Sequence, residues 1–180
     1  GLYVNSNGTV HGNAHGGSDI HGVYFNWISN AEQLAGVQKT ANDANGDAFH
    51  ILMHNFMLKN DIDASSLGEN GFTSIGSGDT AYTGVFDGRG QRLIGLTARG
   101  GLFTNLGSAT KGADGNYQYA GEVKNLHIYS SVFTGDNGQA VGAVAATNQG
   151  IVDNITGLGN TISGGEGSQV GGLVGINKRY

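Results

Sequence analysis

GEVKNLHIYSSVFTGDNGQAVGAVAATNQ, residues 121–149, is followed without a break by GIVDNITGLGNTISGGEGSQVGGLVGINK, residues 150–178. With an offset of about 29 residues and no gap, glycines fall on glycines and apolar residues on apolar residues, a period typical of repeat proteins. Gly121 matches Gly150, and Asn125 matches Asn154. Units this short and glycine-rich cannot bury a core alone, so we expect each to stack on the next. Asn125 and Asn154 are then placed to form a ladder of side chains.

The composition restricts the class of protein. Of 180 residues, 34 are glycine and none is proline or cysteine, while 38% are hydrophobic and 13% are charged, with a net charge of -5. Nucleic-acid binding needs clustered Lys and Arg, so neither nucleic acid nor an anionic membrane surface is expected as a partner. No apolar run approaches the ~18 residues of a membrane helix, which argues against membrane insertion. The first residue is Gly1 rather than Met, which we interpret as a processed chain or an excised piece.

The front of the chain has a different pattern. Residues 1–26 alternate short apolar runs with turns and are predicted to form strands and turns. Residues 29–41 are predicted to form a helix, because Ser29 and Glu32 fit a capping box and Leu34 and Val37 lie on one apolar face. We expect this helix to cover one end of the strands. Beyond residue 49 the pattern indicates only strands and turns, interrupted by a polar, projecting loop over 107–121.

Six motifs in order resemble one family. FDGRGQRLIGL, residues 86–96, resembles the F-D-G-x-G-x-x-I-x-x-L segment of bacterial proteins that carry the GLUG motif. Residues 58–63 (LKNDID), 72–76 (FTSIG), 101–103 (GLF) and 123–126 (VKNL) are similar to its other landmarks. Residues 170–177 (VGGLVGIN) are similar to the repeat that names the motif. The resemblance covers residues 27–180, and VGAVAA at residues 141–146 departs from the usual glycine-rich core.

The resemblance implies a fold and a setting. GLUG-motif proteins are large secreted or cell-surface bacterial proteins, often adhesins like the filamentous haemagglutinins, and the motif also occurs beside surface proteases. Their fold is a parallel β-solenoid, or β-helix. The chain is therefore expected to be all-β, with residues 1–26 as a strand and turn segment and 27–180 as a β-solenoid that has one short helix near its N-terminal end. The resemblance implies no shared catalytic residues, and fold alone does not establish function.

Two clusters of polar residues are candidates for a metal site or a catalytic site. His11, His15 and His21 provide three imidazoles for a zinc or copper ion, but turn histidines without a metal are the favoured interpretation, so no metal or cofactor is expected. Asp61 and Asp63 share one face at strand spacing, as a glycosidase pair or calcium ligands would. The family resemblance favours a structural role for both carboxylates, as turn residues and hydrogen-bond acceptors.

The projecting loop is the predicted contact site. It contains Tyr117, Tyr119 and Asp114, and exposed tyrosines bury contact area at low entropic cost. The leading hypothesis is therefore a non-enzymatic, extracellular structural or adhesive module of a bacterial surface adhesin or filament. Its expected partners are a host-surface glycan or protein, or other copies joined end to end. The alternatives are a carbohydrate-processing enzyme that uses Asp61 and Asp63, and an accessory domain of a surface protease.

Overall fold

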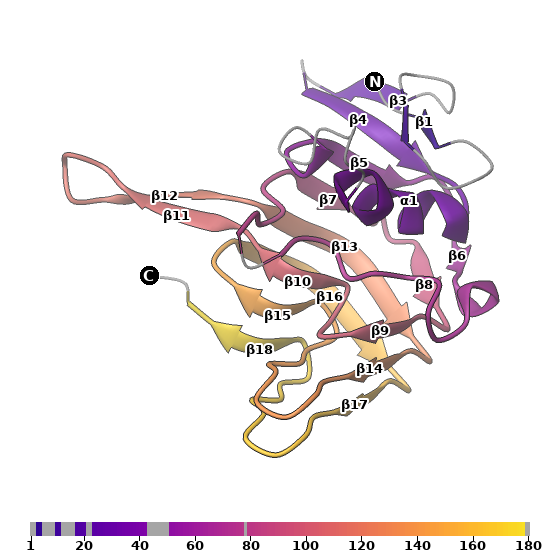
Figure 1. The fold of residues 1–180 in the computed structure, drawn as a ribbon. Coiled ribbons are helices and arrows are strands. Elements are labelled where there is room, and N and C mark those ends of the chain that lie inside the picture. The colour runs from indigo at the N-terminus through magenta and orange to yellow at the C-terminus, as the bar shows by residue number, and fades with distance from the viewer. Residues whose placement is uncertain are drawn as a thin grey trace.

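The computed structural model describes residues 3–4, 10–11, 17–20, 23–42, 51–77 and 79–178. These residues form many short strands and connecting segments, with helix α1 (Ala31–Asn42) near the N-terminal end (Figure 1). The strands are β1 Tyr3–Val4, β2 Val10–His11, β3 Gly17–Ile20, β4 Val23–Ile28, β5 Asn55–Leu58, β6 Ile62–Asp63, β7 Val85–Asp87, β8 Arg92–Ile94, β9 Thr97–Arg99, β10 Phe103–Leu106, β11 Ser108–Lys111, β12 Tyr117–Ala120, β13 Glu122–Tyr129, β14 Val132–Thr134, β15 Ala145–Asn148, β16 Ile151–Leu158, β17 Thr161–Ser163 and β18 Val174–Asn177. A 3-10 helix, η1, spans Ser65–Leu67.

The 29-residue offset of the two C-terminal segments is the register of their strands. β13 pairs in parallel with β16, so that Val123 lies opposite Val152. In the same way β14 pairs with β17, and β15 pairs with β18. The predicted side-chain ladder is also present, since the Asn154 Nδ2 donates to the Asn125 Oδ1 at 2.8 Å. Asn125 in turn donates to Asp87 of the preceding layer at 3.3 Å.

The prediction of a single parallel β-solenoid is wrong. The described strands fall into several separate sheets: an eight-stranded sheet in the order β3-β4-β5-β7-β13-β8-β6 with β16 beside β13, two three-stranded sheets (β10-β15-β18 and β17-β14-β9), and the pairs β1-β2 and β11-β12. Three pairings, β1-β2, β3-β4 and β11-β12, are antiparallel. In each of these pairs, strands that are consecutive in the chain lie antiparallel, which no repeat offset predicts. The chain is all-β with a helix, built from several sheets.

Helix α1 is present where the sequence predicts a helix, but its cap is displaced by one residue. The backbone N–H of Gln33 donates to the Asn30 side chain at 2.9 Å, and the backbone N–H of Ser29 donates to the Gln33 side chain at 2.6 Å. The capping pair is therefore Asn30 with Gln33, not Ser29 with Glu32, because asparagine caps as well as serine does. The helix buries Leu34 and Val37 and is tied to the strands by Gln38, which accepts from the backbone N–H of Gly76 at 2.8 Å.

Aromatic side chains occupy the middle of the core. The Tyr82 ring lies 4.9 Å from the Phe103 ring, and the Phe86 ring meets Phe103 edge-on at 5.7 Å between centroids. All three side chains are fully buried. The Tyr82 hydroxyl donates to the backbone carbonyl of His54 at 2.9 Å, and burial raises the pKa of this phenol well above its ordinary value. This cluster joins the loop before β7 to strand β10, from which the projecting segment begins.

Candidate functional site

The segment predicted as a projecting loop is a β-hairpin. Strands β11 and β12 pair antiparallel, with Ala109 opposite Tyr119 and Lys111 opposite Tyr117. The hairpin extends well away from the rest of the molecule (Figure 1). A turn over residues 112–116 closes it, in which the backbone N–H of Gly112 donates to the Asn116 carbonyl at 2.7 Å. The prediction of a loop was wrong here because Ser-Ala-Thr-Lys and Tyr-Gln-Tyr-Ala alternate too weakly to indicate paired strands.

Tyr117 and Tyr119 lie on one face of this hairpin. They are two residues apart in β12, so their side chains share a face, and their ring centroids are 6.4 Å apart with the planes inclined by 30°. The Tyr117 side chain is 38% exposed, and Tyr119 is half-buried. Lys111, directly opposite Tyr117, is also exposed. Two adjacent rings with polar hydroxyls and a nearby cation form a surface suited to amphipathic, hydroxyl-bearing ligands.

Asp114 forms the turn of the hairpin rather than a contact surface. Its Oδ1 accepts from the backbone N–H of Asn116 at 3.0 Å, and its Oδ2 accepts from the Asn116 side chain at 3.2 Å. These two hydrogen bonds, the backbone one first, lower the pKa of the Asp114 carboxyl. Of the three predicted contact residues, Tyr117 and Tyr119 therefore lie together, whereas the Asp114 carboxylate stabilises the turn of the hairpin.

The Asp114 carboxylate should make the hairpin turn sensitive to acid. Because its folded pKa lies below the value of about 3.9 in an unfolded chain, the stabilisation is complete above that value and is lost as the pH falls through the folded pKa. We expect the amide resonance of Asn116, followed by NMR on lowering the pH, to titrate with a midpoint below about 3.9. The same resonance should not titrate in Asp114→Asn. A midpoint at or above the unfolded value would contradict this role for Asp114.

Three glycines fix the hairpin to the body of the molecule. Gly107 precedes β11 and Gly121 follows β12, and both adopt positive φ angles, of 80° and 92°. A side-chain carbon on Gly121 would lie 2.6 Å from the Gly107 Cα and 2.8 Å from the Tyr82 carbonyl, and one on Gly107 would lie 2.5 Å from the Gly150 Cα. The backbone of Gly107 donates to the Tyr82 carbonyl at 2.8 Å. Only glycines allow this approach of backbones, so the direction of the hairpin is set at its base.

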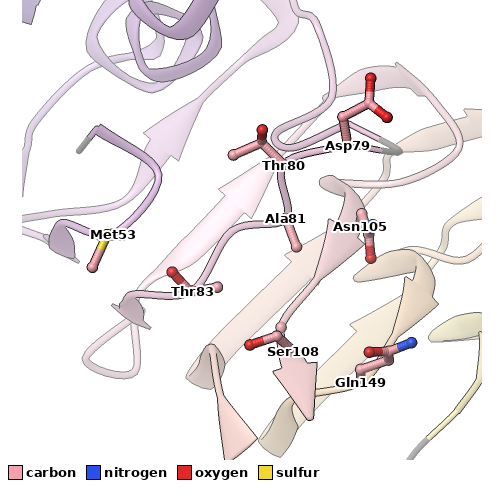
Figure 2. Close-up of a pocket in the computed structure, with 9 residues that line it drawn as sticks. Met53, Asp79, Thr80, Ala81, Thr83, Asn105, Ser108 and Gln149 are labelled. Atoms are coloured by element: carbon pink, nitrogen blue, oxygen red, sulfur yellow. The ribbon is translucent and has the colours of Figure 1, made fainter. Parts of the chain in front are cut away.

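A hollow of about 370 Å³ with a mixed polar and apolar lining opens beside that base (Figure 2). The loop that precedes β7 contributes Thr80 and Thr83, β10 contributes Asn105, and the residue after β15, Gln149, lies on the far side. The remaining lining residues are Met53, Asp79, Ala81, Gly107 and Ser108. Hydroxyl, amide and carboxylate groups beside short aliphatic side chains can hydrogen-bond a polyol without closing around it. Ser108 belongs both to this hollow and to the hairpin, which makes the two surfaces continuous.

Sequence reasoning did not find this hollow. Its walls come from segments that begin near residues 53, 80, 105 and 149, and none of them carries a motif. The walls are held by contacts between backbones: the N–H of Tyr82 donates to the Asn105 carbonyl at 3.0 Å, and that of Gln149 donates to the Leu106 carbonyl at 2.7 Å. The pairing of β10 with β15 and the bridge between Tyr82 and Leu106 join segments that lie far apart in the chain, so no local signal in the sequence indicates the site.

Asp61 and Asp63 are both held in structural contacts. The Asp61 carboxylate accepts from the backbone N–H of Arg92 at 2.8 Å and lies 3.2 Å from the Arg92 guanidinium. Asp63 accepts from the Ser65 hydroxyl at 2.6 Å and from the Ser65 backbone N–H at 3.0 Å, which lowers the pKa of this carboxyl. Both line a second hollow, of about 410 Å³, at the start of α1 together with Glu32. Asp63 therefore serves as a turn residue, and Asp61 serves as a hydrogen-bond acceptor for the neighbouring strand β8.

The predicted histidine cluster lies outside what the structure describes. His15 and His21 are not among the described residues, and of His11 only the backbone in β2 is described. Within the described part of the chain, no three His, Asp or Glu side chains gather as metal ligands would. Among those same residues, no helix is both long and apolar enough to cross a membrane.

Comparisons with known proteins give one similarity. No family model matches the chain, and no solved structure matches it. The chain is similar to halomucin of Haloquadratum walsbyi, with 34% identity over 134 residues, which cover 69% of this chain and 1% of halomucin. The chain thus spans about one hundredth of the length of the curated relative it matches. The resemblance to GLUG-motif proteins stays a prediction.

Proposed function

We propose that this chain is a non-enzymatic, extracellular structural and adhesive module that binds surface glycans through the β11–β12 hairpin and the hollow at its base. One observation carries the proposal: two adjacent tyrosine rings are presented on a hairpin that projects from a base fixed by three glycines. Binding residues characteristically lie on projections from a rigid scaffold. Tyrosine combines an apolar ring with a polar hydroxyl, which suits the mixed surface of a sugar.

The similarity to halomucin supports a location at the cell surface. That similarity involves a small part of a far longer protein, so the module is proposed as one segment among many. The low content of charged residues, 13%, agrees with contacts made by hydroxyls, amides and aromatic rings rather than by ion pairs. Surface association through such contacts needs no cofactor.

The state of Asp61 and Asp63 weighs against a carbohydrate-processing enzyme. A glycosidase requires one carboxyl with a raised pKa as general acid, and a second carboxylate that is free to act as nucleophile or base. Here the pKa of Asp63 is lowered by Ser65, and Asp61 is engaged by both the backbone and the guanidinium of Arg92. These contacts favour a structural role, which leaves adhesion as the better-supported function.

Glycan binding can be measured directly by titrating the chain with a panel of soluble neutral and acidic polysaccharides. We expect replacement of both Tyr117 and Tyr119 by Ala to weaken binding about 30-fold, the loss of about 2 kcal/mol typical of a central aromatic contact. Tyr129→Ala is the matched control, because Tyr129 lies in β13, outside the hairpin, and contacts His127. It should bind as the parent chain does.

Two results would overturn the proposal. Equal affinity of the double tyrosine variant and the parent chain for the polysaccharide would show that the hairpin tyrosines do not contribute to binding. Release of reducing ends from a polysaccharide, abolished by Asp61→Ala in a chain that remains folded, would establish an enzyme instead.

A further inference from the structure

The three C-terminal strands present open edges at one end of the molecule. Among the described strands, β16 pairs with β13, β17 with β14 and β18 with β15, and none of the three has a second neighbour. In Figure 1 these strands lie together at the end opposite α1, in orange to yellow. Open strand edges are templates for pairing with another chain segment.

The apolar core is uncovered at the same end. Val170 is 48% exposed and Leu173 is 36% exposed, whereas their counterparts one repeat earlier, Val141 and Val144, are fully buried. Val152, Ile155 and Ile162 are half-buried, although Val123, Leu126 and Phe133 at the equivalent positions are fully buried. We call this surface the end face and define it as Val152, Ile155, Ile162, Val170 and Leu173 with the open edges of β16, β17 and β18.

We infer that the end face binds a further repeat of the same chemistry as residues 121–149, laid on β16–β18 in parallel register with a 29-residue offset. The end face is a surface other than the hairpin, and binding to it does not involve glycans. The pairing by which residues 150–178 cover residues 121–149 supplies the geometry. Three features of the end face select the chemistry of its occupant.

The first feature is a bend within the edge strand. Asn125 and Asn154 both have φ of 54°, so β13 and β16 bend at the same point in their paired register. An uninterrupted flat strand would lose register on one side of this bend. The occupant therefore needs an asparagine or glycine there, since these residues accept a left-handed backbone. An asparagine would also extend the ladder, by donating to Asn154 as Asn154 donates to Asn125.

The second feature is charge. Asp153 lies opposite Lys124 across the β13–β16 pair, an arrangement of opposite charges. A repeat that carries lysine at this position would give Asp153 a second cationic neighbour. A second molecule that paired its own β16 here would bring no cation, because residues 151–158 include neither Lys nor Arg, and would add another Asp153. Charge thus favours the 121–149 type of repeat over self-pairing of the end face.

The third feature is shape. Gly157 stands where the preceding repeat has the fully buried Ile128, and with Leu158, Asn160, Ile162 and Leu173 it lines a hollow of about 400 Å³. A repeat of the 121–149 type would place its isoleucine over Gly157, as Ile128 now lies beside that glycine. Alternation of large and small side chains between layers is how cores reach native density.

The test adds the proposed occupant to the chain itself. In the extended chain, a copy of residues 121–149 follows Lys178 in place of the last two residues, and amide hydrogen exchange of β16 is compared with that of the parent. We expect exchange of the β16 amides to slow at least about tenfold, because open edge strands lie at the low end of local stability. The change of Lys124→Asp together with Asn125→Val within the added copy should return exchange to the parental rate.

A matched pair of variants separates the end face from the outer face of β16. Leu173→Lys in the extended chain should abolish the added protection, because Leu173 belongs to the end face. Thr156→Lys should leave the added protection unchanged. Thr156 is exposed and lies opposite His127, and both residues lie on the face away from the core, because Leu126 and Ile128 on either side of His127 are buried.

Three outcomes would overturn the inference. One is an added copy that stays disordered while residues 23–178 remain folded. Another is protection that survives the charge and bend changes in the copy, which would mean that any strand can bind. The third is protection of β16 in the parent chain that rises with protein concentration, which would assign the end face to a second copy.

Discussion

Gly121→Ala is expected to lower the free energy of unfolding by about 2–5 kcal/mol, as the sum of a left-handed backbone and an overpacked contact. Gly121 has φ of 92°, which disfavours any residue with a side-chain carbon. That carbon would also lie 2.6 Å from the Gly107 Cα and 2.8 Å from the Tyr82 carbonyl. Both neighbours are backbone, so relief requires moving the base of the hairpin.

Gly115→Ala is the matched control for this effect, measured by chemical denaturation of both variants. Gly115 has a similar φ of 82°, but no atom lies within 4 Å of the added carbon. It should therefore lose only about 1–2 kcal/mol, the cost of the backbone conformation alone. Equal losses in the two variants would mean that the close approach of the three glycines does not fix the hairpin.

Phe103→Ala is expected to destabilise the molecule by about 3–5 kcal/mol, the range for removing a buried aromatic ring. Phe103 is fully buried, and its ring contacts both Tyr82 and Phe86. Its strand β10 joins β15 and also bridges to Ile75, so the cavity would lie where several sheets meet. Against a typical total stability of about 5–15 kcal/mol, this loss would leave much of the population unfolded at moderate denaturant.

Val132→Ala provides the comparison for Phe103→Ala in the same denaturation measurement. Val132 is an apolar strand residue in β14, but it is 37% exposed. Surface substitutions of this kind change stability by about 0.5 kcal/mol or less. A loss of that size in Phe103→Ala as well would show that the aromatic cluster does not hold the sheets together.

The register of the C-terminal strands could be predicted from the sequence because several residue types keep phase together. Glycine, asparagine and apolar positions all recur at one offset, and the structure pairs those strands at that offset. The ladder of Asn125 and Asn154 follows from the same phase. The extension of this pattern to a single parallel β-solenoid failed because the described strands form several sheets and because β3-β4 and β11-β12 pair antiparallel, which a repeat offset does not predict.

The candidate site could be predicted only in part. The polar segment with Tyr117 and Tyr119 is visible as a break in the repeat, and the rings lie side by side. The role of Asp114 depends on a turn that local sequence does not distinguish from a contact loop. The hollow beside Gly107 draws on segments far apart in the chain, which only the complete set of strand pairings brings together.

The most direct measurement is an NMR titration of the chain with the polysaccharide that binds it most tightly, followed through backbone amide shifts. Adhesion through the hairpin requires that the changes centre on Tyr117, Tyr119 and Ser108 and extend to Thr80 and Thr83 in the hollow. Changes that centre instead on Asp61 and Asp63, with the hairpin amides unmoved, would contradict binding through the hairpin.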